Sequence, residues 1–278
     1  LTRLKILNLS DNEFGEDDLT LNLMDALLKV EALESLDLSS NTGIFFPECL
    51  ESFNLILMFR RFTHLNLSST SLREYHIECL ATGLRHCTAL TSFDLRDNQF
   101  GSAGAKSLTQ VLSESCTDLR HLDLGHSLDC FSGIPHLLSS LPYLCHLDLS
   151  GAMMGPGEFA ELARCTSLST LILPGTTPPH PSYDAPGVGH VDVGCVLERN
   201  SRMVHLDLGH HRFGSRAARR IFRATTGSEK LEHLDLSGNN LGSSGFRSVT
   251  TWLKDCMSLR QVHLSNNRIG VEGATQLS

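Results

Sequence analysis

Apolar residues recur along this chain in units of about 28 residues. Each unit places apolar side chains at its positions one, four and six, as at Leu231, Leu234 and Leu236, and many units have asparagine at position nine. Position four falls at Leu7, Leu36, Leu65, Phe93, Leu122, Leu147, Leu171, Leu206, Leu234 and Val262. Successive members of this series are 24 to 35 residues apart. A period this regular predicts about ten stacked copies of one structural unit.

Positions four and six predict a short strand in every unit. Residues that are two apart point to the same side of a strand, so both leucines of each Leu-x-Leu face the core and the residue between them faces away. An asparagine at position nine bonds backbone groups that the turning chain leaves unpaired. The asparagines at this position are Asn12, Asn41, Asn98, Asn239 and Asn267. Units with Thr70, Ser127, Ala152, Thr176 or His211 there are expected to pack less regularly.

A helix is predicted after each turn. Gly101 and Gly104 are followed by Leu108 and Leu112, and apolar residues three to four apart form one face of an amphipathic helix. A narrow strand and a wider helix make each unit a wedge, and stacked wedges bend into a horseshoe. We therefore expect one α/β solenoid domain over residues 1–278, with parallel strands on its concave face and helices and loops on its convex face.

Two segments carry a resemblance to a known family. Residues 231–246 read LEHLDLSGNNLGSSGF, and residues 259–274 read LRQVHLSNNRIGVEGA. Both resemble the leucine-rich repeat of the ribonuclease-inhibitor type, whose units carry a full helix. Within that type, the chain is similar to the repeat domains of the capping-protein/myosin-I linker family and of NOD-like receptors. The resemblance implies a ligand-binding or scaffold module within a larger protein.

Two features depart from the regular pattern. The longest interval contains five prolines between residues 174 and 190 and has no helical period, which predicts an irregular loop on the convex side. The chain also begins and ends inside a unit, and no polar cap is visible at either end. We therefore expect the sequence to be a fragment of a larger protein.

Composition and charge narrow the range of functions. The net charge of −8 is opposite to the basic surface that a general nucleic-acid binder needs. The longest strongly apolar run, residues 55–59, is far shorter than the roughly 20 residues that span a bilayer. Of nine cysteines, Cys87, Cys116, Cys165 and Cys256 each lie three residues before a unit, which predicts one recurring buried site for reduced thiols. We expect a cytoplasmic protein without a transmembrane segment or a cofactor.

Acidic and histidine side chains form two rows on the predicted concave face. Position five is acidic in six of ten units, and position three is histidine in five. The candidate partner-binding residues are Asp94, Asp123, Asp148, Asp207, Asp235, His121, His146, His205 and His233. Neighbouring parallel strands lie about 4.8 Å apart, so the carboxylates repel unless the histidine row offsets them. We predict that this face binds a protein with a basic surface and that histidine protonation weakens the attraction. The alternative interpretation is ordinary strand decoration.

A basic stripe is predicted on one helix. Arg216, Arg219, Arg220 and Arg223 follow helical spacing, while the opposite face is apolar. The stripe is a candidate anion-binding site for phosphoinositide headgroups, which would bring peripheral membrane contact, for an acidic partner or for another copy of the chain. A solvated helix face is the alternative.

Enzymatic and metal-binding interpretations have less support in the sequence. The turn of Arg96, Asp97 and Asn98 resembles the Ran GTPase-activating protein, which shares this repeat type, but such turns are ordinary in repeats. Zinc held by His205, Asp207, His233 and Asp235 would need side chains that converge on one point, which a flat sheet face disfavours. We therefore expect neither catalytic residues nor a metal.

The leading functional hypothesis is a protein-protein interaction scaffold that holds a macromolecular partner on the concave face. One alternative is the ligand-sensing repeat region of an immune-type receptor. The other is GTPase activation of the Ran type. The sequence sets neither the partner nor the oligomeric state.

Overall fold

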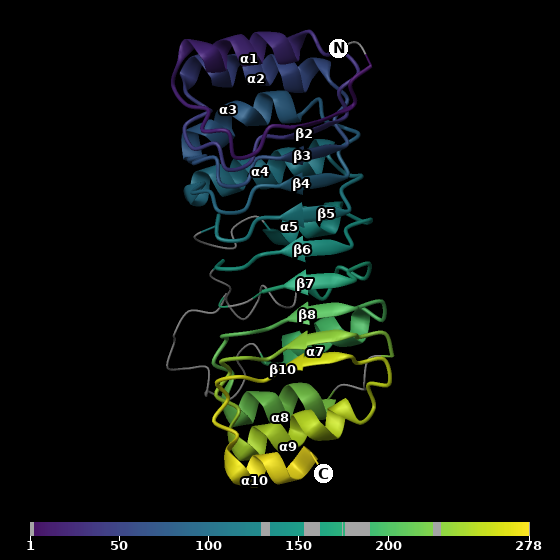
Figure 1. The fold of residues 1–278 in the computed structure, drawn as a ribbon. Coiled ribbons are helices and arrows are strands. Elements are labelled where there is room, and N and C mark those ends of the chain that lie inside the picture. The colour runs from purple at the N-terminus through teal and green to yellow at the C-terminus, as the bar shows by residue number, and fades with distance from the viewer. Residues whose placement is uncertain are drawn as a thin grey trace. The chain divides into compact units, whose positions relative to one another are not determined.

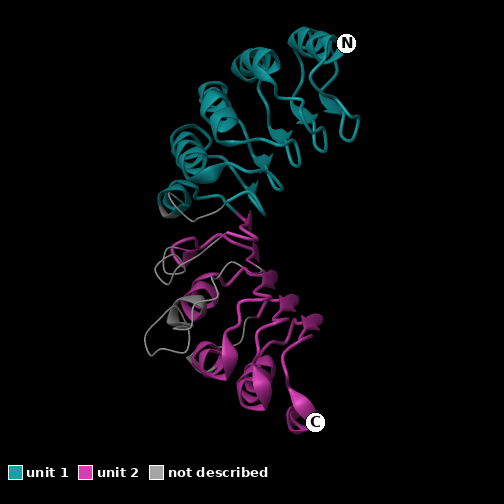
Figure 2. Ribbon diagram, turned by 90° about the vertical axis from the view of Figure 1, so that its left-hand side faces the viewer, with its two compact units in different colours: residues 1–144 teal, residues 145–278 magenta. Residues whose placement is uncertain are grey.

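The computed structural model describes residues 3–128, 134–152, 162–173, 175, 190–224 and 229–277 (Figure 1). The chain divides into two compact units, Leu1–Leu144 and Cys145–Ser278, drawn in teal and magenta in Figure 2. Each unit repeats one motif, in which a three-residue strand leads through a turn to a segment on the other side of the sheet. Apart from Gly175 and His190, the irregular loop that we expected at 174–190 lies outside the described residues.

The first unit contains five strands and five helices within its described residues. The strands are β1 (Ile6–Asn8), β2 (Ser35–Asp37), β3 (His64–Asn66), β4 (Ser92–Asp94) and β5 (His121–Asp123). The helices are α1 (Asp18–Leu28), α2 (Pro47–Phe59), α3 (Glu74–Leu84), α4 (Gly101–Ser115) and α5 (Ile134–Ser140). The strands pair in parallel and in chain order, and position four of one strand pairs with position four of the next.

The second unit repeats this arrangement. Its strands are β6 (His146–Asp148), β7 (Thr170–Ile172), β8 (His205–Asp207), β9 (His233–Asp235) and β10 (Gln261–His263). Its described helices are α7 (His190–Arg199), α8 (Gly214–Ala224), α9 (Gly242–Leu253), α10 (Gly270–Ala274) and the short 3-10 helix η2 (Thr275–Leu277). The same parallel register holds from β6 to β10. The predicted α/β repeat solenoid, with about ten parallel strands and helices on one side, is therefore confirmed.

The core of each unit is built from the periodic leucines. In the most regular repeat, Leu231, Leu234 and Leu236 are almost completely buried. The position-four residues of the outermost strands, Leu7 and Val262, are half-buried because each has a neighbouring strand on one side only. Burial against the preceding and following repeats therefore stabilises each repeat, as expected for a solenoid.

The asparagines of position nine hold the turns together, as predicted. Asn41 donates from Nδ2 to the carbonyl of Leu9 in the preceding repeat and to the carbonyl of Leu38 in its own repeat, both at 2.9 Å. Thr70 and Ser127 replace part of this bonding, because their hydroxyls donate to the carbonyls of Leu67 and Leu95. The strands of the repeats that contain Thr70 and Ser127 keep the common register.

Glycine allows neighbouring helices to approach closely. A Cβ atom on Gly245 in α9 would lie 2.9 Å from the Cα atom of Ser215 at the start of α8, which is closer than packed atoms allow. Gly242, the first residue of α9, has a φ of +61°, a left-handed conformation that glycine adopts without strain. The glycines after the turn therefore serve both the entry to the helix and its packing.

The recurring cysteine site is buried, as predicted. Cys87, Cys116, Cys165 and Cys256 are at most 6% exposed. The Sγ atom of Cys87 lies 3.7 Å from the carbonyl oxygen of Leu57, which is a weak hydrogen bond to the preceding repeat. Burial raises the pKa of the Cys87 and Cys116 thiols to about 12. None of the eight described cysteines forms a disulfide.

These environments predict selective alkylation. Cys79 is exposed on α3 and is expected to react with iodoacetamide in the native protein, whereas Cys87 and Cys116 react only after unfolding, because a buried thiol does not ionise readily. Peptide mapping by mass spectrometry after native and denaturing treatment checks this result. Equal labelling of Cys79 and Cys87 in the native protein would contradict the buried site.

Candidate functional site

Each unit presents one sheet face that the helices leave uncovered, as Figures 1 and 2 show. We call it the open face and define it by the side chains at positions three and five of each strand. The register places Asp94 beside Asp123 in the first unit and Asp207 beside Asp235 in the second. Ile172 interrupts the acidic row, because it is the neighbour of both Asp148 and Asp207. The predicted rows are therefore present, but they consist of short groups.

The histidines of position three are less uniformly grouped. His205 and His233 lie side by side on β8 and β9, with ring centroids 5.6 Å apart. His121 pairs with Ser92, and His146 pairs with Thr170. Adjacent described histidines of this row thus occur in the second unit.

The position-five side chains have a structural role that the sequence did not reveal. At the eight aspartates and asparagines of this position, Oδ1 accepts a hydrogen bond from the backbone N–H two residues later, where the strand turns. The distances are 2.8 Å at Asn8, 2.9 Å at Asp37, 3.0 Å at Asn66, 3.1 Å at Asp94, 3.0 Å at Asp123, 2.8 Å at Asp148, 2.8 Å at Asp207 and 2.7 Å at Asp235. This bond explains why aspartate or asparagine occupies this position in eight of the ten repeats, since their short side chains reach their own backbone, whereas Ile172 and His263 are the exceptions. The second carboxylate oxygen of several of these aspartates has another partner, as at Asp37, where Oδ2 accepts from Nδ2 of Asn8 at 3.4 Å.

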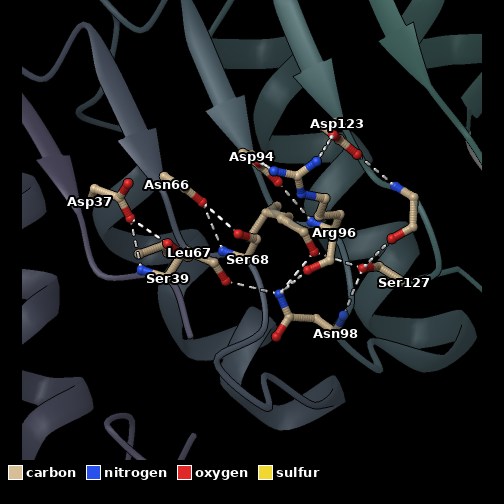
Figure 3. Close-up of polar contacts among 12 residues, drawn as sticks. Asp37, Ser39, Asn66, Leu67, Ser68, Asp94, Arg96, Asn98, Asp123 and Ser127 are labelled. Carbon is tan, nitrogen blue, oxygen red and sulfur yellow. Dashed lines mark hydrogen bonds and ion pairs between the residues drawn. The ribbon is translucent and has the colours of Figure 1, made fainter. Parts of the chain in front are cut away.

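An arginine offsets the carboxylates of the first unit, as Figure 3 shows. Position seven is serine in β2 and β3, where its hydroxyl donates to the position-five side chain, but it is Arg96 after β4. Nη2 of Arg96 lies 3.3 Å from Oδ2 of Asp94, and Nη1 lies 3.7 Å from Oδ2 of Asp123. We expected the histidine row to offset these charges. Arg96 does so at this pair, and its departure from serine or glycine was the signal that the sequence offered.

The second unit has no such arginine among its described residues at position seven, which are Ser150, Gly209, Ser237 and Ser265. Burial raises the pKa of Asp207, and the charges of Asp235 and Asp148 raise it further, against the lowering effects of the Gly209 N–H and of His205. His263 is 3.9 Å from Asp235 through its Nδ1 atom. The Asp207 and Asp235 pair is therefore a site of unbalanced negative charge.

The predicted arginine stripe lies on the helical side. In α8, Ala217, Ala218 and Ile221 are buried, while Arg216 and Arg219 are exposed and Arg220 is half-buried. The amphipathic spacing is therefore confirmed for these residues. The side chain of Arg223 lies outside the described residues. The stripe therefore lies on the helical side of the second unit, away from the open face.

The turn that resembles a GTPase-activating site has a structural use. Asn98 is 2% exposed, and its side chain bonds the backbone of Leu67, Leu72 and Leu95. Arg96 is held by Asp94 and Asp123. Neither Asn98 nor Arg96 is therefore positioned as a free catalytic group.

Within the described residues, no helix combines the length and the apolar content that a membrane span requires. The same residues contain no group of three histidine, cysteine, aspartate or glutamate side chains placed to hold a metal ion.

Comparisons with known proteins agree with the repeat. The sequence profile described as Leucine Rich repeat matches residues 86–108, 227–248 and 255–278. The mouse protein named NACHT, LRR and PYD domains-containing protein 14 is 31% identical over 213 residues, which cover 75% of this chain and 18% of the mouse protein. The chain thus spans less than a fifth of the length of that relative. The parallel strands, the periodic core and these matches together identify the chain as a leucine-rich-repeat protein.

Proposed function

We propose that this chain is a protein-binding region of a larger protein and that it holds its partner against the open face. The repeats support a binding module rather than an enzyme, because the residues that recur from repeat to repeat build a packed scaffold. One observation carries the choice of face. The carboxylates of Asp207 and Asp235 lie side by side, and no described arginine or lysine forms an ion pair with either.

The comparison favours a receptor over a cytoskeletal linker. The name of the mouse relative records NACHT and PYD domains beside its repeats. By analogy, we infer that this chain is the ligand-sensing repeat region of an immune-type receptor that carries further domains. The buried free thiols support a reducing, cytoplasmic setting.

The charge of the second unit indicates a basic partner. The pKa of Asp207 is raised, first by burial and then by neighbouring carboxylates. A guanidinium or ammonium group placed beside the pair offsets that repulsion and favours the ionised carboxylate. Such charges also increase the rate of association with a basic surface.

Proton uptake is expected to oppose this binding. His205 and His233 flank the two carboxylates on the same strands. Positive charge on these imidazoles would repel a basic partner, so binding is expected to be weaker at pH 5.5 than at pH 8. Binding that is unchanged over this range would reject the pH dependence.

Removing two charges tests the proposal. Asn8 and Asn66 already make the position-five hydrogen bond in the first unit, so Asp207→Asn with Asp235→Asn changes charge while it preserves the turn. Selection of a displayed random peptide library for binding to the wild-type protein is expected to enrich basic peptides. Calorimetry should show their affinity falling about tenfold in the double variant, as for lost charge pairs at an interface.

A helix-face variant provides the control. Arg219→Gln removes one charge from the exposed face of α8 and should leave the affinity of the same peptides unchanged. Peptides that bind the double Asp→Asn variant as tightly as the wild type would reject the open face as the binding surface.

A further inference from the structure

The turns that follow β8, β9 and β10 enclose a surface hollow in the second unit. Its volume is about 420 Å³. It is lined by His210, Arg212, Gly238, Asn240, Asn266 and Arg268. These residues occupy positions eight and ten of three consecutive repeats. The hollow is separate from the arginine stripe of α8 and from the position-five carboxylates.

The backbone of these turns shapes the hollow. All six lining residues have a positive φ, between 53° and 68°. The turns are held in a stack because the N–H of Gly238 donates to the carbonyl of Ser265 at 2.9 Å. At the centre, a Cβ atom on Gly238 would lie 2.4 Å from Nδ1 of His210. Because Gly238 has no side chain, the ring of His210 lies directly against its backbone, and these two residues form the floor of the hollow.

Two arginines flank this floor. Arg212 and Arg268 are the only arginines at position ten in the ten repeats, and the shorter Asn240 lies between them in the middle repeat. Strand spacing of about 4.8 Å places their backbones about 10 Å apart. Two long side chains at that distance can both reach an anion held between them.

The positive charge of the hollow is not balanced by described neighbours. Both arginines are exposed, and neither has an ion pair or side-chain hydrogen bond with any described residue. The side-chain amides of Asn240 and Asn266 are likewise uncommitted within the described chain. Two other surface hollows, lined respectively by Glu78 with Arg85 and by Glu31 and Glu34 with Arg61, each combine both charges.

The guanidinium groups set the class of ligand. Arginine stays charged at every physiological pH, and its planar set of donors matches phosphate oxygens in pairs. A phosphate monoester carries a charge of about −1.5 to −2 near pH 7 and three strong acceptor oxygens. The amides and the imidazole of His210 supply further hydrogen bonds around such a group.

We propose that this hollow binds the phosphate of a phosphorylated serine or threonine in a partner protein. The inference builds on the proposed function, because the same turns begin at Asp207 and Asp235 of the open face. A chain segment with basic residues on the open face and a phosphate in the hollow matches both charges. A membrane with an anionic surface matches only the hollow, since the neighbouring carboxylates repel it.

The test uses the full chain and a matched variant. Arg212→Asn with Arg268→Asn removes both cations, and Asn240 shows that asparagine accepts this left-handed backbone, with a φ of 54°. The probes are a lysine-flanked phosphoserine peptide, its unphosphorylated twin, and phosphatidylcholine vesicles that contain phosphatidylinositol 4-phosphate. Calorimetry measures the peptides, and co-sedimentation measures the vesicles.

Phosphorylation is expected to tighten peptide binding to the wild type at least about tenfold, as two charge-assisted contacts would. In the double variant this ratio should fall to about one, while the affinity of the unphosphorylated twin stays unchanged. Equal affinity of the two peptides for the wild type, or a phosphate preference that survives in the variant, would overturn the site. Binding of the vesicles without a phosphopeptide preference would overturn the choice of a protein ligand.

The two proposals fail in different ways. Binding of the phosphopeptide alone, lost in the arginine variant, supports the hollow and counts against the open face. Equal binding of both peptides that is lost in Asp207→Asn with Asp235→Asn supports the open face and rejects the hollow.

Discussion

Replacing Asn98 with alanine is expected to lower the free energy of unfolding by about 3 kcal/mol, because three buried backbone groups lose their partner at about 1 kcal/mol each. Its Nδ2 atom donates to the carbonyls of Leu67 at 2.9 Å and Leu95 at 2.8 Å, and its Oδ1 atom accepts from the N–H of Leu72 at 2.8 Å. Figure 3 shows the side chain reaching from its own turn into the preceding one. Urea denaturation of the variant and the wild type gives the difference, and faster amide exchange at Leu72 localises it.

Asn12→Ala provides a control at the same position of the first repeat. Its Nδ2 atom donates to the carbonyl of Ser10 in the same exposed turn. The loss should be below about 0.5 kcal/mol, as for most surface substitutions. Similar losses for Asn12→Ala and Asn98→Ala would show that bonding between consecutive turns does not carry the stability of the stack.

Acid is expected to destabilise the second unit through His211. This histidine occupies position nine, is 1% exposed and stacks on Phe213 at a centroid distance of 4.9 Å. Burial lowers its pKa to about 4, while the carbonyl of Leu173 acts in the opposite direction and the charge of His210 lowers it further.

The sign follows from proton uptake. Between pH 6.5 and pH 4 the unfolded chain binds a proton at His211 that the folded chain does not bind, so stability falls as the pH falls through this window. The full loss below pH 4 is on the order of 3 kcal/mol. Thermal melts across the window measure it, and proton NMR of the His211 ring gives the pKa directly.

His211→Asn separates this effect from other titrations. Asparagine is the residue found at position nine in Asn98 and Asn239, and it does not titrate. The stability of the variant should depend less on pH between 6.5 and 4 than that of the wild type. The raised pKa of Asp207 acts in the opposite direction but is common to both proteins. Identical pH profiles, or an NMR pKa near 6.5 for His211, would refute the buried neutral imidazole.

The amino-acid sequence was sufficient to predict the repeat, its strands and the faces of its helices. Leu234 and Leu236 had to point the same way, and Ala217 and Ile221 had to face the core, because burial follows the local period of strand and helix. The same period placed Asp207 beside Asp235 and His205 beside His233, since advancing by one repeat moves a residue to the neighbouring strand. These features depend on periodicity, which a linear chain displays in full.

Other features depend on how side chains of different repeats meet. Arg96 joins Asp94 to Asp123, His211 is enclosed and kept neutral, and Arg212 and Arg268 line one hollow together. Each of these contacts arises at a repeat that departs from the common pattern. The pattern describes what the repeats share, whereas the contacts of an exceptional residue are set by side-chain direction, turn conformation and the neighbouring repeats in space. That information exists only once the chain is folded.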